Sequence, residues 1–242
     1  IDDVRRTAAE RPKPMSKMRQ IIGRRLQQSK QTIPHFYVTV KVDMTDLIAL
    51  RKELKASRIA ISYNDFILKS AALALREFPA VNSFTEDGLN VQWHSAVNVG
   101  MAVSVDKGLV VPVLRDTDAM AMDEIHDVAR DVAIRARDGQ LLPAEMQGGT
   151  FTVSNMGMLN VDEFSAIINP GESAILAVSS IVATPVANKH REVVVRDLMA
   201  ITLSADHRVI DGALAAMFTN AIRRRLQNIE FWRQELGVGG KG

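Results

Sequence analysis

Cysteine is absent from the 242 residues of this chain. Its absence excludes disulfides, thiolate metal sites and cysteine nucleophiles, and it leaves the compartment open with a lean towards a cytosol-like environment. Aromatic residues are scarce at 5%, so the expected core consists of Val, Ile, Leu, Met and Ala. No apolar run approaches the roughly 18 residues that a membrane span needs, and we therefore expect no membrane segment.

The N-terminus has neither an initiator methionine nor the apolar stretch of a signal peptide. We therefore expect the chain to be a piece of a longer protein. Residues 1–14 carry charges, two prolines and little apolar periodicity, which is typical of a linker or tail. The predicted domain organisation is a linker over 1–14 and one folded domain over 15–242.

The sequence has no strong excess of charge of either sign. Its 30 basic and 28 acidic residues give a net charge of +2, which offers no electrostatic argument for a nucleic-acid partner. The triplet Arg223-Arg224-Arg225 falls near the end of a predicted helix, where cations suit the helix dipole. We interpret it as a solvated helix end.

Signatures of metal or nucleotide binding are also missing. The five histidines (35, 94, 126, 190 and 207) include no pair at metal-ligand spacing, so no metal site is predicted. Gly148-Gly149 precedes a predicted strand, but it lacks the spacing of a dinucleotide or phosphate loop.

Apolar periodicity predicts an interleaved series of helices and strands. Helices are expected from Ser16 onward (Met18, Ile21, Ile22 and Leu26 recur at helical spacing), through 47–54, from the capping pair Ser62/Asp65 to Pro79, and over 122–138 and 213–227. Strands are expected at 35–44, 96–105, 108–114, 150–154, 173–181, 192–196 and 198–205. The order lacks the regular beat of a doubly wound fold. It favours an α/β (α+β) domain with a large mixed sheet covered by helices on one side.

The segment 206–212, Asp-His-Arg-Val-Ile-Asp-Gly, is the first candidate for a reaction centre. It follows an apolar run that is typical of a buried strand, and loops at strand ends are where scaffolds present reactive side chains. The imidazole of His207 titrates near neutrality and can move a proton to or from a thiol or hydroxyl. The alternative is that Asp211 only caps the last helix and His207 is a polar loop residue.

Ser154, at the end of a predicted strand and ahead of Gly157, is the second candidate. Its hydroxyl could act as a nucleophile, as a donor to an oxyanion, or only in forming a turn. No Gly-x-Ser-x-Gly elbow surrounds it, which argues against the nucleophile role.

Taken together, the motifs resemble a known family. The His-x-x-x-Asp-Gly pattern at 207–212 resembles the active-site motif of the dihydrolipoamide acyltransferase (E2) components of 2-oxo acid dehydrogenase complexes, and chloramphenicol acetyltransferases share a related motif. Further matches lie at 14–19, 31–37, 64–67, 108–112, 149–157 and 164–170. Several are most similar to the acetyl-transferring E2 of pyruvate dehydrogenase. The chloramphenicol enzymes typically have a second histidine where this chain has Asp206.

The resemblance implies a chloramphenicol-acetyltransferase-like fold and the transfer of an acetyl group between dihydrolipoamide and coenzyme A. In the family pattern His207 is the general base, Ser154 donates to the oxyanion, and Asp211 supports His207. The coenzyme A contacts cannot be assigned residue by residue. Alternatives are a branched-chain or succinyl substrate, or a non-catalytic scaffold subunit of the same fold.

The resemblance also implies partners. His and Ser would meet at the interface of a homotrimer, which would assemble into a core of 24 or 60 subunits. N-terminal domains that precede the family's catalytic core, and are not in this chain, would bind the E1 and E3 components and carry the lipoyl group. The implied compartment is the bacterial cytoplasm or the mitochondrial matrix.

Overall fold

The computed structural model describes residues 12–106 and 108–238. In chain order the elements are α1 (Lys17–Thr32), β1 (His35–Asp43), α2 (Thr45–Ala56), α3 (Tyr63–Glu77), β2 (Ser83–Phe84), β3 (Gln92–Trp93), β4 (Val99–Met101), β5 (Val103–Val105), β6 (Gly108–Val110), β7 (Val113–Leu114), α4 (Met122–Arg137), η1 (Pro143–Met146), β8 (Phe151–Asn155), η2 (Gly157–Leu159), β9 (Ala174–Ala187), β10 (Val193–Asp206), α5 (Gly212–Gln227) and α6 (Ile229–Glu235). No helix among these residues is both long and apolar enough to cross a membrane.

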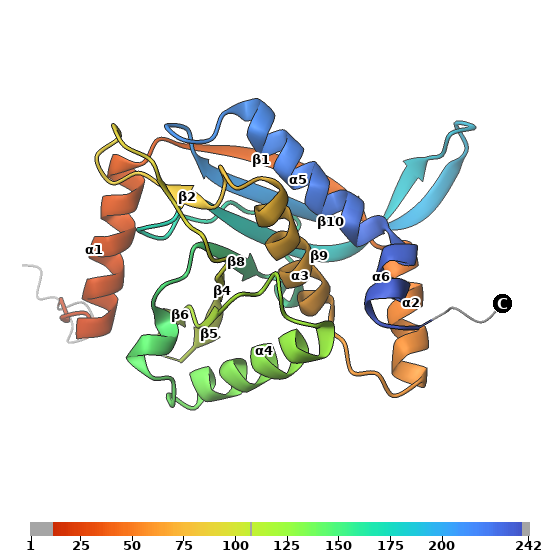
Figure 1. Cartoon of the computed structure of the whole chain (residues 1–242), viewed down its shortest axis with the longest axis horizontal. Helices are drawn as coiled ribbons and strands as arrows, with labels where there is room; N and C mark the ends of the chain where they lie inside the picture. The colour runs from red at the N-terminus through yellow and green to blue at the C-terminus, as the bar shows by residue number, and fades with distance from the viewer. Residues whose placement is uncertain (1–11, 107, 239–242) are drawn as a thin grey trace, which may run out of the picture.

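The main sheet has six strands in the order β1-β10-β9-β8-β4-β7 (Figure 1). The β4–β8 and β8–β9 pairs are parallel and the other pairs are antiparallel, so the sheet is mixed as the sequence predicts. Alternating side chains give each strand two faces. Helix α5 packs on β1 and β10, and α3 packs on α5.

The core lies between the sheet and these helices. The α3 side chains Phe66, Leu68 and Leu75 are at most 1% exposed, and the Phe66 ring meets that of Trp232 edge-on at 4.9 Å. From the sheet side, Phe151 meets Phe218 of α5 with ring centroids 5.6 Å apart. The few aromatic residues therefore join the layers of an otherwise aliphatic core.

On the opposite face of the sheet, irregular chain covers part of the strands. Thr39 of β1 donates a hydrogen bond to Glu163 (2.8 Å), and Asn169 donates one to Thr152 of β8 (2.8 Å). The segment 161–173 thus crosses from β8 to β1. Polar strand residues beneath it, such as Thr152 and Thr202, are buried although they face away from the helices.

Several helix limits follow from their capping residues, as the sequence predicts. Ser16 accepts from Arg19 N at the start of α1, and Ser62 with Asp65 forms a reciprocal capping box on α3. Gly139, at φ +69°, follows the end of α4. The apolar face predicted for α1 is, however, largely uncovered within this chain, since Met18 is 43% and Ile21 54% exposed.

Four of the predicted strands are divided or merged in the structure. The strand expected at 96–105 divides into β4 in the main sheet and β5 in a separate hairpin. The strand expected at 108–114 divides into β6 and β7 near Pro112, which has no N–H to donate to a ladder. The strands expected at 192–196 and 198–205 are one strand, β10, with a bulge between Met199 and Ile201.

The pair β9–β10 is much longer than expected. Each strand has 14 residues, and the distal half of the hairpin projects from the body of the molecule (Figure 1). Val193 and Val195 there are 77% and 68% exposed. Isolated chains rarely expose such an apolar stripe without a partner to cover it.

Candidate active site

His207 lies in a tight turn that joins the end of β10 to α5. Its backbone N–H donates to the carbonyl of Pro34 (3.1 Å), just before β1. The backbone N–H groups of Val209 and Ile210 both donate to Asp206 O, and the Ile210 side chain is completely buried. The turn is therefore anchored on both sides of the histidine.

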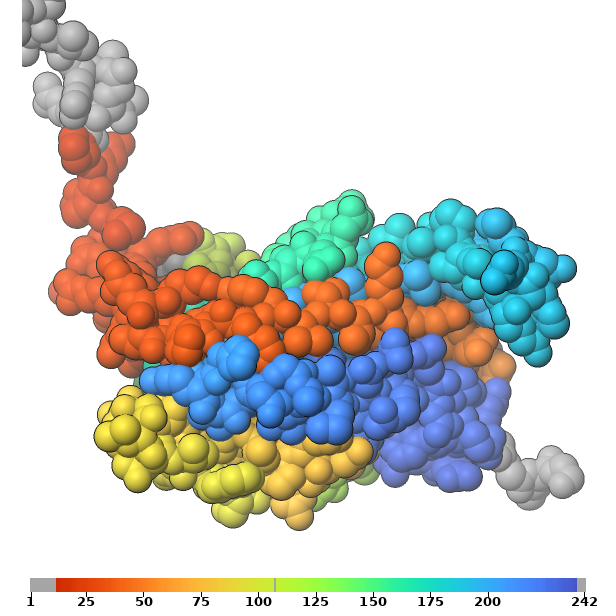
Figure 2. All heavy atoms as spheres, turned by 90° about the horizontal axis from the view of Figure 1, so that it is seen from above, coloured from red at the N-terminus to blue at the C-terminus, as the bar shows by residue number. Residues whose placement is uncertain are grey.

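A buried ion pair fixes the same turn from inside. Asp206 is 1% exposed, and its carboxylate accepts from Arg208 Nε (3.0 Å to Oδ1) and from Nη2 (2.8 Å to Oδ2). The Arg208 backbone N–H donates to the same Oδ1 (3.0 Å). Arg208 also packs on Gly88 of the β2–β3 connection, and Figure 2 shows the segment around residues 80–95 beside the 207–211 turn. Because Asp206 and Arg208 are occupied with each other, only His207 of this trio remains available.

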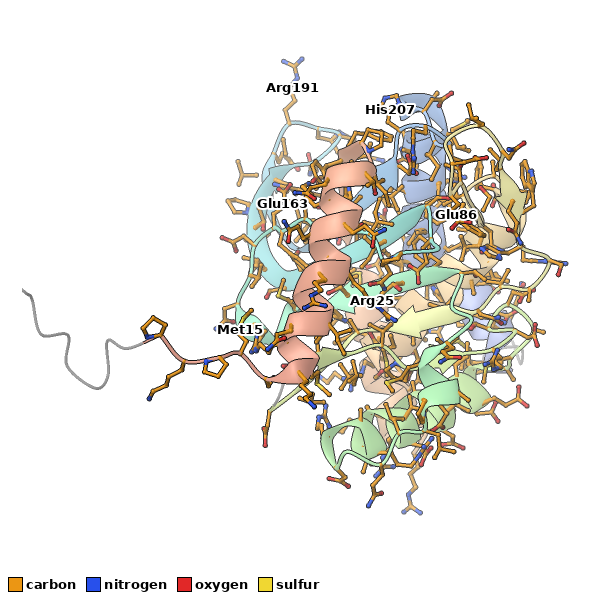
Figure 3. All side chains as sticks on the ribbon, turned by 90° about the vertical axis from the view of Figure 1, so that its left-hand side faces the viewer. Met15, Arg25, Glu86, Glu163, Arg191 and His207 are labelled. Carbon is orange, nitrogen blue, oxygen red and sulfur yellow. The ribbon has the colours of Figure 1, made fainter. Side chains whose placement is uncertain are left out.

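The ring of His207 is exposed and rests on Phe36, with centroids 4.4 Å apart and planes at 46°. Within the described part of the chain neither ring nitrogen has a hydrogen-bond partner. Figure 3 places His207 at the margin of the molecule, beyond the top of α1. An imidazole that is held in place and has free nitrogens can accept a proton from a molecule that approaches from outside.

Asp211 caps α5. Its Oδ1 accepts from Leu214 N at 2.7 Å. Within this chain the carboxylate therefore stabilises the start of the helix on which the turn ends, as the capping alternative proposed. Any support it gives to His207 acts through the shape of the turn.

Ser154 lies in β8, paired in register with Ala177 of β9. It is half-buried, and its hydroxyl has no hydrogen-bond partner among the described residues. The next residue, Asn155, donates to Asn64 (3.1 Å) and accepts from Gly157 N (2.8 Å), so the strand end is well ordered around the serine. A free hydroxyl on a fixed strand suits a donor to a developing oxyanion.

One chain does not bring Ser154 and His207 together. Across the sheet, Ser154 aligns with Ala177 and Ala177 with Thr202, four residues before Asp206 on β10. Two strand spacings of ~4.8 Å and four steps of ~3.3 Å put the Cα atoms of Ser154 and Asp206 ~16 Å apart. A base must reach the attacking thiol and an oxyanion donor the carbonyl oxygen of the same reacting pair, each at about 3 Å, and the backbone separation of ~16 Å argues against one chain supplying both.

Two surface depressions, of about 700 and 470 Å³, lie near the far end of α5, around Arg223, Arg224 and Asn228, and neither includes His207 or Ser154. No single-chain pocket at His207 can be assigned to coenzyme A from these residues.

The sequence interpretation missed three polar features. These are the Asp206–Arg208 pairing, a hydrogen bond between His126 Nδ1 and Asp65 Oδ2 (2.7 Å) that joins α4 to α3, and the buried carboxyl of Glu172. No local pattern in the sequence links His126 to Asp65, 61 positions earlier. Glu172 had one signal in the sequence, an acidic residue directly before a strongly apolar strand.

The arrangement of the sheet and helices matches a known fold. The chain superposes on a chloramphenicol acetyltransferase with a TM-score of 0.56, covering 84% of this chain and 94% of that one at 14% identity. The fold is therefore chloramphenicol-acetyltransferase-like, as the sequence predicts.

The family follows from the sequence itself. The family model described as 2-oxoacid dehydrogenases acyltransferase (catalytic domain) matches residues 7–233, and the chain belongs to this family. It is 46% identical, over 89% of its length and 45% of the relative's, to the dihydrolipoyllysine-residue acetyltransferase component of the mitochondrial pyruvate dehydrogenase complex of Schizosaccharomyces pombe. The corresponding Rhizobium meliloti protein is 41% identical over 89% of this chain and 49% of its own length.

Solved structures agree. A probable dihydrolipoamide acetyltransferase from Listeria monocytogenes matches with a TM-score of 0.86 at 35% identity, covering 92% of this chain and 97% of that one. The dihydrolipoamide acetyltransferase of Azotobacter vinelandii, studied for the roles of a serine, a histidine and an asparagine in its mechanism, matches with a TM-score of 0.86 at 32% identity over 93% of each chain. The present chain spans about half the length of the curated relatives.

Proposed function

We propose that this chain transfers an acetyl group between dihydrolipoamide and coenzyme A, as the catalytic core of a pyruvate dehydrogenase complex. The observation that carries the proposal is His207, held in a clamped turn with both ring nitrogens free, in a chain 46% identical to an acetyltransferase of such a complex. In the Azotobacter protein the histidine and asparagine studied are four residues apart, which is also the spacing of His207 and Asp211.

The proposed reaction is a direct exchange between two thiols. His207 takes the proton from the attacking thiol, and the thiolate adds to the thioester carbonyl carbon to form a new C–S bond. The carbonyl oxygen becomes negative and accepts a hydrogen bond from Ser154. As the tetrahedral intermediate collapses, the original C–S bond breaks and the leaving thiolate takes the proton back from His207. General-base catalysis typically contributes about 10²–10⁴-fold.

Because Ser154 and His207 of one chain are too far apart, the serine is proposed to come from a neighbouring chain in a homotrimer. The uncovered side chains of Val193, Val195 and α1 supply surface for such contacts. A related solved structure is that of a cubic pyruvate dehydrogenase core, which supports the further assembly of trimers into a larger core. We propose 24 or 60 subunits for that core. The E1 and E3 components and the lipoyl group would be brought by segments of a longer protein, with residues 1–14 as the linker and 15–242 as the catalytic core.

The compartment is proposed from the relatives. The Schizosaccharomyces protein is named as mitochondrial, and the Rhizobium protein is bacterial. We propose the mitochondrial matrix or the bacterial cytoplasm accordingly.

A second candidate is a structural subunit without activity. The mouse pyruvate dehydrogenase protein X component, whose name specifies no transferase, is 38% identical over 89% of this chain and 44% of its own length. Against this candidate stands the joint presence of Ser154, His207 and Asp211. The third possibility is the same chemistry on a branched-chain or succinyl group.

One assay separates these candidates. Initial rates of transfer to dihydrolipoamide would be measured with acetyl-, succinyl- and isobutyryl-coenzyme A, for the wild type and for H207A. We expect a preference for acetyl and a loss of at least about 100-fold in H207A. Wild-type rates no higher than those of H207A would identify a structural subunit, and a preference for a larger acyl chain would overturn the acetyl assignment.

A further inference from the structure

Glu172 is a buried acid without a counter-charge. It lies directly before β9 and is only 7% exposed. Its Oε1 accepts a hydrogen bond from the Thr152 hydroxyl (2.8 Å), and that hydroxyl accepts from Asn169 Nδ2 (2.8 Å). Its Oε2 is buried without a partner, and Glu172 forms no ion pair among the described residues. Such a group is far less costly to bury as the neutral acid than as the carboxylate.

Charged groups surround this position but do not reach the carboxyl. Arg115 packs on Gly148 and donates to the carbonyls of Ala144 and Gln147. On the loop side the His94 ring is bonded to the backbone of Gly171. On the β10 side Asp206 is already paired with Arg208. Desolvation raises the pKa of Glu172 to about 8, while the hydrogen bonds from Thr152 and Asn169 oppose the shift.

The residues around Glu172 form the base of the His207 turn. The carbonyl of the next residue, Ser173, accepts from Asp206 N (2.8 Å), and the Ser173 hydroxyl donates to the carbonyl of Ser83. Four residues before Glu172, Ile168 N donates to His35 Nε2 (3.1 Å) at the start of β1. Segment 168–173 is therefore fastened to β8 through Glu172, to β1 through His35 and to the end of β10 through Ser173.

We propose that Glu172 is a positioning residue that acts only as the uncharged acid, holding segment 168–173 under the His207 turn, and that its ionisation releases the turn and stops catalysis. It touches neither the proposed substrate nor His207, and it acts through Ser173 and Asp206. The inference rests on the proposed role of His207 as the base. It adds an alkaline limit to the activity that is set by the protein and not by the substrate thiols.

The test compares the wild type with E172Q, which keeps the shape and hydrogen-bond acceptor of the neutral acid but cannot ionise. The exposed Glu230 supplies a matched control, E230Q. The ratio of kcat at pH 9 to kcat at pH 7 would be measured for acetyl transfer in each protein. Ionisation of the substrate thiols is the same for all three and cancels. With a pKa of about 8, about nine-tenths of Glu172 is ionised at pH 9, so the wild-type ratio should be about tenfold below that of E172Q, and E230Q should match the wild type. Superimposable profiles for the wild type and E172Q would overturn the proposal.

Two readouts do not depend on catalysis. The thermal midpoint of the wild type should fall relative to that of E172Q between about pH 4.5 and about pH 8, because the folded protein then retains a proton that the unfolded chain has lost. Infrared spectra of protein labelled at glutamate should contain a protonated carboxyl at pH 7 that disappears on titration through about pH 8. If no variant transfers acyl groups, the proposed function fails while these readouts still report on Glu172. If E172Q does not fold, the absence of a protonated glutamate from the wild type at pH 7 overturns the proposal.

Discussion

Two inactive variants, S154A and H207A, should regain activity when they assemble into the same trimers. Each chain holds Ser154 and the start of the His207 turn ~16 Å apart on one sheet, so the proposed reaction would need the histidine of one chain and the serine of another. In a trimer that contains both S154A chains and H207A chains, a site is intact where an S154A chain supplies the histidine and an H207A chain supplies the serine.

The size of the recovery follows from counting interfaces. With equal amounts and random assembly, the chain that supplies the histidine to a site carries His207 in about half of the cases, and the chain that supplies the serine carries Ser154 in about half. About a quarter of the sites in a cyclic trimer are therefore intact. S154A alone is expected to retain about 0.1–1% of wild-type activity, since the loss of one oxyanion donor costs about 10²–10³-fold. Mixing should therefore raise the activity from about 1% or less to about 25% of the wild-type value.

The assay is acetyl transfer on co-refolded mixtures, with incorporation of both chains verified by native mass spectrometry. The matched control mixes wild type with the double variant S154A/H207A. A shared site predicts about a quarter of wild-type activity there, whereas a site within one chain predicts about half. Verified mixed trimers with no recovery, together with half activity in the control, would refute the shared site.

Three further predictions test the residues that position the site. Replacing Asp206 in D206N removes the buried partner of Arg208 and should cost about 2–4 kcal/mol of unfolding free energy with a large drop in kcat, whereas D118N at the exposed Arg76–Asp118 pair should cost at most about 1 kcal/mol, both measured by urea denaturation. The variant S62A loses the capping box of α3 and should lower stability by about 1 kcal/mol without changing KM, and an unchanged denaturation midpoint would contradict the capping role. Burial lowers the pKa of His35 below its ordinary value of 6.5, and the hydrogen bond from Ile168 N needs Nε2 unprotonated. This stabilisation is therefore fully present above pH 6.5 and is lost as the pH falls through the lowered pKa, so thermal midpoints of H35N should depend less on acid pH than those of the wild type.

The sequence was most informative where local patterns determine local structure. The alternation of β1, the capping pair Ser62/Asp65 and the stop at Gly139 appear in the structure where they were predicted. Each depends on neighbours within four residues or on a single period of apolar side chains, and these preferences survive in the folded chain.

Predictions failed where distant partners decide the outcome. The residues 96–105 alternate regularly, yet β4 pairs with β8 and β7 while β5 pairs only with β6. No local pattern contains that division. The same holds for His126, whose ring is bound to Asp65 on another helix, and for Glu172, whose buried carboxyl is bound to Thr152 of β8, 20 positions earlier. The pairing of His207 with Ser154 came from the family resemblance, and the sheet register places it beyond one chain.

The register also explains why a reaction that needs only two side chains is built on so long a sheet. Strands β9 and β10 fix the positions of Ser154, on the neighbouring β8, and of the His207 turn on one sheet, so neither side chain can move to the other. In the proposed reaction a neighbouring chain supplies the missing half, and substrates would meet the base only between chains. On this argument assembly is part of the catalytic apparatus. Substitutions at the exposed Val193 and Val195 should consequently lower kcat in proportion to the trimer lost, even though both side chains lie on the far half of the hairpin from His207. Analytical ultracentrifugation alongside the transfer assay would measure both quantities, and full activity in a monomeric variant would contradict the argument.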